Sequence, residues 1–294
     1  MPESKIAPSK IIASLYHILR LLRDLWDFSG ELMNHVLQGK NAYVCGSTQG
    51  IGRACAVALA EGGARVTLIA RHEEALQITR DALNASPGQK HDYIVADFRD
   101  WRALQRITAE HARVNGPIHI LINNTGGPAA GKAIEARPEE YESAFQQHIL
   151  CNQGLVQAVA PSMREAGYGR IINIISTSVI TPIRGLGVSN TIRGAVANWA
   201  KTLADELGPF GITVNNILPG FTATARLKSL LQGRASREGT TLEEIEERAK
   251  AQIPLRRLAD PEEIASVVAF LASPAASYVS GVNLPVDGGR LAAQ

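Results

Sequence analysis

A glycine-rich turn at residues 46–52 is the first feature of the sequence that could do chemistry. Gly46, Gly50 and Gly52 follow a short β-branched run and precede an alanine-rich segment expected to be helical to about Glu61. Such glycines permit a tight turn and let the backbone approach a pyrophosphate at the helix N-terminus. A tight turn without ligand is the alternative, but the position between strand and helix favours a cofactor site. The expected contacts are Gly46, Ser47, Thr48, Gln49, Gly50, Ile51 and Gly52.

The end of the second predicted strand indicates which dinucleotide is bound. An acidic residue there would bind the ribose 2′-hydroxyl of NAD, but Ala70 occupies the position and Arg71 follows it. The Arg71 guanidinium suits a 2′-phosphate, whereas Glu73 and Glu74 fall in the first turn of the next helix. We therefore expect NADP(H) rather than NAD(H), although Gln49 supplies no second basic residue in the glycine turn.

Five motifs occur in a fixed order over about residues 38–290. They are Gly46-x-x-x-Gly50-x-Gly52, Asn123-Asn124-Thr125-Gly126, the loop Pro219–Thr224, the segment Leu258–Ile264, and Ser280-Gly281 with Val286–Gly289. In this order they resemble the short-chain dehydrogenase/reductase family. The resemblance implies a Rossmann-type fold and further cofactor contacts at Asp97, Asn123, Thr125, Gly126, Pro219, Gly220, Thr222 and Thr224. Each has a local alternative: a helix cap for Asp97, a satisfied backbone for Asn123, and a loop threonine without ligand for Thr224.

The catalytic residues of that family are only partly present. Relatives place a serine after the fifth strand, a tyrosine 13 residues later and a lysine four residues beyond. Here Ser176 supplies the serine, but Ser189 and Arg193 occupy the other two positions. No tyrosine lies between Tyr168 and Tyr278. Ser176 can stabilise an oxyanion and Arg193 can bind the nicotinamide ribose, whereas Ser189 is too weak an acid to replace a phenol.

His148 aligns with the asparagine that often completes the family's catalytic set. An ordinary histidine has a pKa near ~6.5, so His148 could pass a proton to the substrate directly or through water. A histidine satisfied inside the fold, or exposed, is the alternative.

The elements that must position these residues alternate regularly from Asn41 onward. Seven β-branched runs separated mostly by helices predict one domain, residues 38–294, with a doubly wound, parallel, seven-stranded α/β sheet. The predicted strands are residues 42–45, 65–70, 93–96, 118–122, 170–175, 212–217 and 282–286.

Two regions fall outside this alternation. In residues 1–37, an apolar seam of Ile11, Leu15, Ile18, Leu22 and Leu25 predicts an amphipathic helical extension that Ser9 caps and Gly30 ends. We expect it to dock on a partner subunit or on the body of the fold, with peripheral membrane contact as the alternative. The polar stretch at about 225–252 follows a strand C-terminus, where substrate lids are found in open α/β sheets.

Composition excludes several classes of function. A net charge of +2 with 30 basic and 28 acidic residues gives no basic face for nucleic acid, and no apolar stretch is long enough to span a membrane. Three cysteines without metal-ligand spacing predict no metal site and indicate a cytoplasmic protein. The resemblance further implies a homo-oligomer, a tetramer or dimer, built on the fourth and fifth helices and the C-terminal segment.

Three functions are consistent with these residues. The first is an NADP(H)-dependent oxidoreductase that transfers hydride to or from a carbonyl or hydroxyl compound, with an atypical proton donor. The second is a nicotinamide-binding protein without turnover, and the third is a lyase or hydratase on the same fold. The intact cofactor motifs and Ser176 favour the first, whereas Ser189 favours the others.

Overall fold

One parallel sheet of seven strands organises the chain. The computed structural model describes residues 36–85 and 89–293. The strands are β1 (Asn41–Cys45), β2 (Arg65–Ala70), β3 (Asp92–Val95), β4 (Ile120–Asn123), β5 (Gly169–Ile174), β6 (Ile212–Pro219) and β7 (Asn283–Val286). Each predicted strand is confirmed, with ends that move by one or two residues.

The strand order in the sheet is β3-β2-β1-β4-β5-β6-β7, and all neighbouring strands pair in parallel. The order reverses between β1 and β4, so the loops that follow these two strands diverge and leave a crevice at their carboxyl ends. In open α/β sheets this is where ligands bind. The predicted doubly wound Rossmann-type fold is confirmed.

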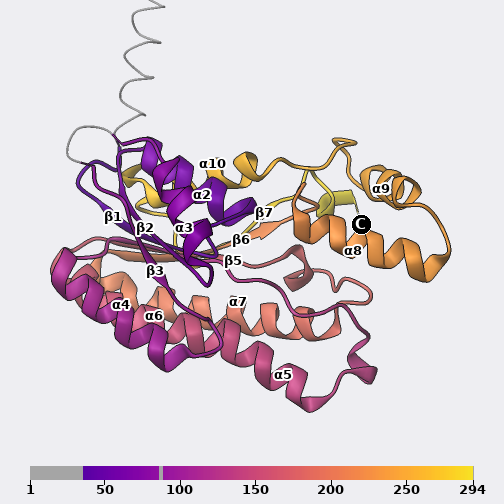
Figure 1. Ribbon diagram of the computed structural model, residues 1–294, viewed down its shortest axis with the longest axis horizontal. Coiled ribbons are helices and arrows are strands. Elements are labelled where there is room, and N and C mark those ends of the chain that lie inside the picture. The colour runs from indigo at the N-terminus through magenta and orange to yellow at the C-terminus, as the bar shows by residue number, and fades with distance from the viewer. Residues whose placement is uncertain (1–35, 86–88, 294) are drawn as a thin grey trace, which may run out of the picture.

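Helices cover both faces of the sheet (Figure 1). One layer contains α2, α3 and α10, and the other contains α4, α6 and α7, while α8 and α9 project beyond the sheet edge. The helices are α2 (Gly50–Glu61), α3 (Glu73–Asp81), α4 (Trp101–Asn115), α5 (Pro138–Phe145), α6 (Cys151–Glu165), α7 (Gly187–Leu207), α8 (Ala225–Glu238), α9 (Leu242–Ala251) and α10 (Pro261–Ala272). Short helical segments join some of them: η1 (Ala133–Glu135), η2 (Gln146–Leu150), η3 (Thr177–Val179), η4 (Gly208–Phe210), η5 (Pro274–Ala276) and η6 (Leu291–Ala293).

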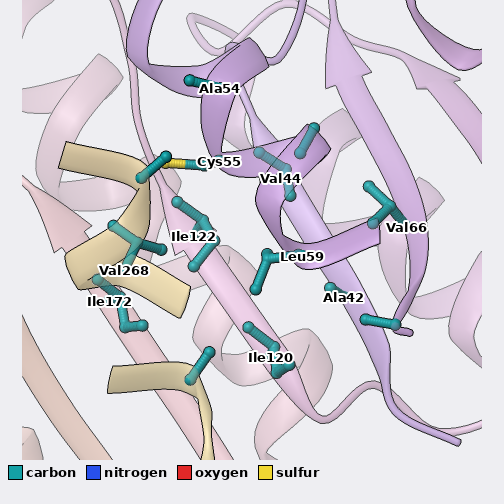
Figure 2. Packing of buried hydrophobic residues seen from close by; sticks show 14 of the residues in the cluster. Ala42, Val44, Ala54, Cys55, Leu59, Val66, Ile120, Ile122, Ile172 and Val268 are labelled. Carbon is teal, nitrogen blue, oxygen red and sulfur yellow. The ribbon is translucent and has the colours of Figure 1, made fainter. Parts of the chain in front are cut away.

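The core lies in two layers because successive strand residues point to opposite faces. On β1, Ala42 and Val44 pack with α2 and α10, as Figure 2 shows, whereas Tyr43 and Cys45 face the helices of the other layer. The three cysteines are fully buried in these layers. Burial raises the pKa of the Cys45 and Cys55 thiols to about 12.

A row of asparagine side chains connects four neighbouring strands across the sheet. Asn123 Nδ2 donates to Asn173 Oδ1, and Asn173 Nδ2 donates to Asn216 Oδ1, each at 2.8 Å. Asn216 Nδ2 then donates to Asn283 Oδ1 at 2.8 Å. These residues are direct partners in the pairing of β4, β5, β6 and β7, so the amide ladder favours this register of the four strands.

The remaining predictions about organisation have different outcomes. The helical extension at residues 1–37 lies outside the described residues except for Val36 and Leu37, so it stays a prediction. The stretch at 225–252 is helical, as α8 and α9, with a small core of its own that includes Leu231 and Ile245. None of the helices in the described ranges is long and apolar enough to cross a bilayer.

Replacing Asn173 tests how much the sheet depends on the ladder. In Asn173→Ala, the Asn123 amide and the Asn216 carbonyl lose their partners in a fully buried site. Each orphaned buried group costs about 1–3 kcal/mol, so we expect unfolding free energy to fall by about 3 kcal/mol in urea titrations. The exposed Asn198→Ala is the control and should change it by less than about 0.5 kcal/mol. Equal effects of the two substitutions would show that the ladder contributes nothing specific.

Candidate active site

The glycine turn has the geometry that its sequence predicts. Gly46 and Gly50 have φ of 58° and 51°, in the left-handed region that glycine adopts without strain. A Cβ on Gly52 would lie 2.1 Å from Gly46 O, so only glycine lets α2 approach β1 this closely. Asn124 Nδ2 braces the turn by donating to Cys45 O and Gly46 O. Glycine is therefore the residue type that fits the backbone conformation at Gly46 and Gly50 and the close approach at Gly52.

The first turn of α2 is available to an anion. Gln49 is the N-cap, and its side chain makes no capping hydrogen bond. No acidic residue lies in that first turn, and the fully buried Ser47 hydroxyl has no partner in the described part of the chain. Free N–H groups and a positive helix end favour a phosphate. Thr48 and Ile51 are half-buried beside this surface, and the cradle fits a dinucleotide pyrophosphate.

The adenine side of the crevice has a charge arrangement that sequence alone did not predict. Arg71 follows β2 and is exposed, close enough to contribute to the lowered pKa of Asp97. The main cause of that lowered pKa is Arg99, whose guanidinium pairs with the Asp97 carboxylate at 2.6 Å. Asp97 lies two residues beyond β3 and does not cap α4, because Asp100 accepts from Ala103 N there. Two arginines, Arg71 and Arg99, therefore act on the Asp97 carboxylate.

Ser176 lies directly beyond β5, at the N-cap of η3. Its Oγ accepts a hydrogen bond from Ser178 N at 3.0 Å. Because this bond uses an acceptor lone pair, the hydroxyl proton remains free to donate to a developing oxyanion. The Ser176 side chain is half-buried, so a substrate can reach it.

Arg193 reaches from α7 to the ends of two strands. Its Nη1 donates to Ile174 O at 2.8 Å and its Nη2 donates to Thr125 O at 3.4 Å. Burial, and then the nearby Arg226, lower its pKa to about 10, so the group stays charged at neutral pH. Ser189 lies one turn earlier on α7, and its hydroxyl has no hydrogen-bond partner among the described residues.

His148 is buried within the π-helical segment η2, which connects α5 to α6. Its Nδ1 and the Thr125 hydroxyl share a hydrogen bond of 2.7 Å, and Nε2 has no partner in the described ranges. Burial first, and the charge on Arg193 second, lower its pKa to about 2. The sequence assigned an ordinary histidine pKa, but this environment keeps the imidazole neutral throughout the physiological range.

The loop after β6 closes the crevice. Gly220 packs against Asp287, because a Cβ on Gly220 would lie 2.7 Å from Asp287 Cα. Thr222 is buried with its hydroxyl bonded to Gly220 O. Thr224 Oγ1 accepts from Leu227 N and caps α8, while its methyl group lies near Gly50. The loop that begins at Pro219 thus lies beside the glycine turn.

The crevice also contains residues that sequence reasoning did not select. Arg226 Nη2 donates to Pro128 O and connects the start of α8 with the loop after β4. Asn173 and Asn216 continue the row of amides from Asn123. Asn173 and Asn216 lie on two successive predicted strands, and Asn123 directly follows the predicted strand before them; this was the available signal. Gly126 was predicted as a cofactor contact, and a Cβ on it would meet nothing within 4 Å.

The fold and the glycine cradle define a nucleotide-binding α/β protein of the Rossmann type. The family described as enoyl-(acyl carrier protein) reductase matches residues 46–290. The 3-oxoacyl-[acyl-carrier-protein] reductase FabG of Vibrio cholerae is 33% identical over 86% of this chain and 98% of its own. The NADPH-dependent reductase BacG of Bacillus subtilis is 28% identical over 86% and 98%.

Solved structures agree with these relatives. L-sorbose reductase from Gluconobacter frateurii, complexed with NADPH and L-sorbose, superposes with a TM-score of 0.82 and 28% identity over 88% of this chain and 99% of its own. An actinorhodin polyketide ketoreductase with NADPH gives 0.80 and 31% over 85% and 97%. The chain belongs to the short-chain dehydrogenase/reductase family and is an oxidoreductase of that type.

The lowered pKa of His148 should make stability depend on pH. The unfolded chain takes up a proton at His148 below about pH 6.5, whereas the folded chain does so only near pH 2. The unfolded state therefore binds more protons in this window, and stability is lost as pH falls. From pH 7.5 to 5.0 this one group should cost about 2 kcal/mol in urea titrations.

His148→Gln should reduce that loss, because glutamine cannot take up the proton in the unfolded state. The exposed His72→Gln is the matched control and should keep the wild-type slope. The buried, neutral state assigned to His148 is wrong if both variants lose the same stability between pH 7.5 and 5.0 as the wild type.

Proposed function

We propose that this protein is an NADP(H)-dependent reductase of carbonyl compounds, in which Ser176 donates to the oxyanion and the proton comes from a group other than residue 189. The observation that carries the proposal is the arrangement at the ends of β4 and β5. There the Arg193 guanidinium donates to Ile174 O at the end of β5 and to Thr125 O just beyond β4. Ser176 follows Ile174 by two residues. This arrangement supports a charged ligand for the nicotinamide ribose next to a free hydroxyl donor.

NADPH supplies the hydride when bound, and the chain's residues supply binding and orientation. The α2 N-terminus and the glycine turn fit the pyrophosphate, as the uncapped first turn indicates. Arg71, exposed directly after β2, is the residue we assign to the 2′-phosphate, and the assignment is supported by relatives that are NADPH-dependent by name or contain NADPH. Thr224 keeps its place beside Gly50, although its hydroxyl already caps α8.

The source of the proton is the least ordinary part of the proposal. Ser189 remains protonated at neutral pH, and His148 has a pKa of about 2, so neither is an acid matched to pH 7. His148 can still orient the Thr125 hydroxyl, because its Nδ1 shares a hydrogen bond with that group. Water at the crevice mouth, polarised by the charge of Arg193, is the proton source we favour.

Cofactor binding without turnover is the second candidate. The observation that favours it is the same absence of a neutral-pH acid among the described residues beside Ser176. Tight NADPH binding together with no NADPH oxidation across ketones, aldehydes and quinones would select this candidate or the lyase alternative.

Arg71→Ala should weaken NADPH much more than NADH. A charged hydrogen bond to the 2′-phosphate is worth about 1.5–3 kcal/mol, so NADPH affinity should fall roughly 10- to 100-fold in calorimetric titrations. Arg106→Ala removes a second exposed arginine, from α4, and should leave both affinities unchanged. Equal wild-type affinities for the two cofactors, or a preference that survives Arg71→Ala, would contradict the assignment.

Ser176→Ala should cost far more activity than Ser189→Ala. Loss of one oxyanion donor lowers kcat on the order of 10²–10³-fold, whereas Ser189 has no role in the proposed step and should cost less than about threefold. NADPH oxidation is measured with the best ketone of a broad panel, and NADPH affinity is the control for both variants. A larger loss in Ser189→Ala would make residue 189 the proton donor after all.

We also propose a homo-oligomer, a tetramer or dimer. The outer edge of β7 has no neighbouring strand in the described sheet, and Phe270 on α10 and Tyr278 in the segment before β7 are exposed. Light scattering at micromolar concentration should return two or four times the chain mass of 31.5 kDa. A monomer mass would refute this.

A further inference from the structure

Two guanidinium groups face the same point in the loop after β4. A Cβ placed on Gly127 would lie 3.5 Å from Arg226 Nη2 and 3.8 Å from Arg193 Nη2. The two arginines come from different elements, α8 and α7, and they converge on a residue with no side chain. A group at the side-chain position of Gly127 would thus contact both guanidinium groups.

No counter-charge balances this pair. Neither arginine forms a salt bridge with any carboxylate of the described chain, and both make their hydrogen bonds to backbone carbonyls. The pKa of Arg193 falls because of burial and because of Arg226, and partial burial lowers the pKa of Arg226 as well. Two neighbouring cations, one of them buried, repel each other, and an anion between them would remove that cost.

Arg193 connects Gly127 with the residues that we propose to react. Arg193 shares a face of α7 with Ser189, four residues earlier, and binds the carbonyl of Ile174, two residues before Ser176. A Cβ on Gly126 would meet nothing within 4 Å. An anion bound by Arg193 therefore lies near the end of β5, from which Ser176 follows.

The location favours substrate over cofactor as the source of this anion. Arg226 begins α8, in the segment that the sequence assigns to a substrate lid, and it crosses to Pro128 on the loop after β4. The cofactor phosphates have their own sites in the uncapped start of α2 and at Arg71.

We propose that Arg193 and Arg226 bind an anionic group of the substrate, a carboxylate or a phosphate carried near the carbonyl that is reduced. Guanidinium groups bind both anions through paired N–H donors, so the chemistry is shared by the two. This inference rests on the proposed reductase function for the role of the carbonyl. The anion site itself does not require turnover, so it can be tested separately.

The first test measures binding to the protein saturated with NADP⁺. The probes are 4-oxopentanoate and 5-oxohexanoate against their methyl esters, and dihydroxyacetone phosphate against dihydroxyacetone. Calorimetry at low ionic strength should give at least tenfold tighter binding for one class of anion than for its neutral partner. The preferred class distinguishes a carboxylate from a phosphate, and equal binding of both neutral and anionic probes would overturn the proposal.

The second test uses Arg226→Met, which keeps much of the side-chain volume and removes the charge. The preference for the anion should fall on the order of tenfold, while NADP⁺ affinity stays within twofold. Lys228→Met removes an exposed cation two residues along α8 and should change neither quantity. Loss of NADP⁺ affinity in Arg226→Met would assign the pair to the cofactor and overturn the proposal.

Turnover separates this inference from the function on which it rests. Reduction of the anionic ketones, lowered in kcat/KM by Arg226→Met, supports both. Selective binding of the anions without any NADPH oxidation supports the anion site and removes the reductase. Reduction of neutral ketones at the same kcat/KM as their anionic partners supports the reductase and overturns the anion site.

Discussion

The buried amide ladder from Asn123 to Asn283 is the interaction on which the candidate active site depends. It joins β4, β5, β6 and β7 at one level, and the loops that carry Thr125, Ser176 and the segment beginning at Pro219 leave the sheet directly beyond it. A slip in register would orphan two buried amides for each broken link, so the pairing is strongly specified. Arg193 adds a second connection across the same edge when it binds carbonyls of both β4 and β5 loops. Polar contacts thus hold in place the strands and loops that carry Thr125 and Ser176.

Charge at this edge is arranged in an unusual way for a site that must move a proton. The buried histidine is neutral, the two nearby side-chain charges are both positive, and the described carboxylates lie elsewhere. Such a site stabilises negative charge well, whether on an oxyanion or on a ligand group, and donates protons poorly. A serine at position 189, where the family resemblance implies a phenol, is therefore consistent with the positive pair at Gly127. In the proposed reductase both favour electrostatic binding over acid catalysis.

The sequence predicted the fold nearly completely, because each strand is a short β-branched run bounded by turn residues, and because Gly46, Gly50 and Gly52 allow few alternatives. The family resemblance, applied through the spacing of its catalytic residues, predicted roles for Ser176, Ser189 and Arg193. The sequence could not foresee the pKa of His148, which depends on burial and on the charge of a residue 45 positions away. Nor could it foresee Arg226, whose partner Pro128 lies 98 positions earlier and becomes a neighbour only when α8 crosses the loop after β4. Long-range pairing, rather than local pattern, carries the information that was missing.

The three buried cysteines give each layer of the protein its own chemical reporter. Cys55 is on the buried face of α2, whereas Cys45 on β1 and Cys151 on α6 lie in the opposite layer, and all three are fully buried. A thiol with a raised pKa and no solvent contact reacts only after its surroundings open. Alkylation kinetics resolved by peptide mass would therefore measure the opening free energy of the two layers separately in a single native sample. The chain needs no engineered label to show whether the helices on its two faces loosen together or one before the other.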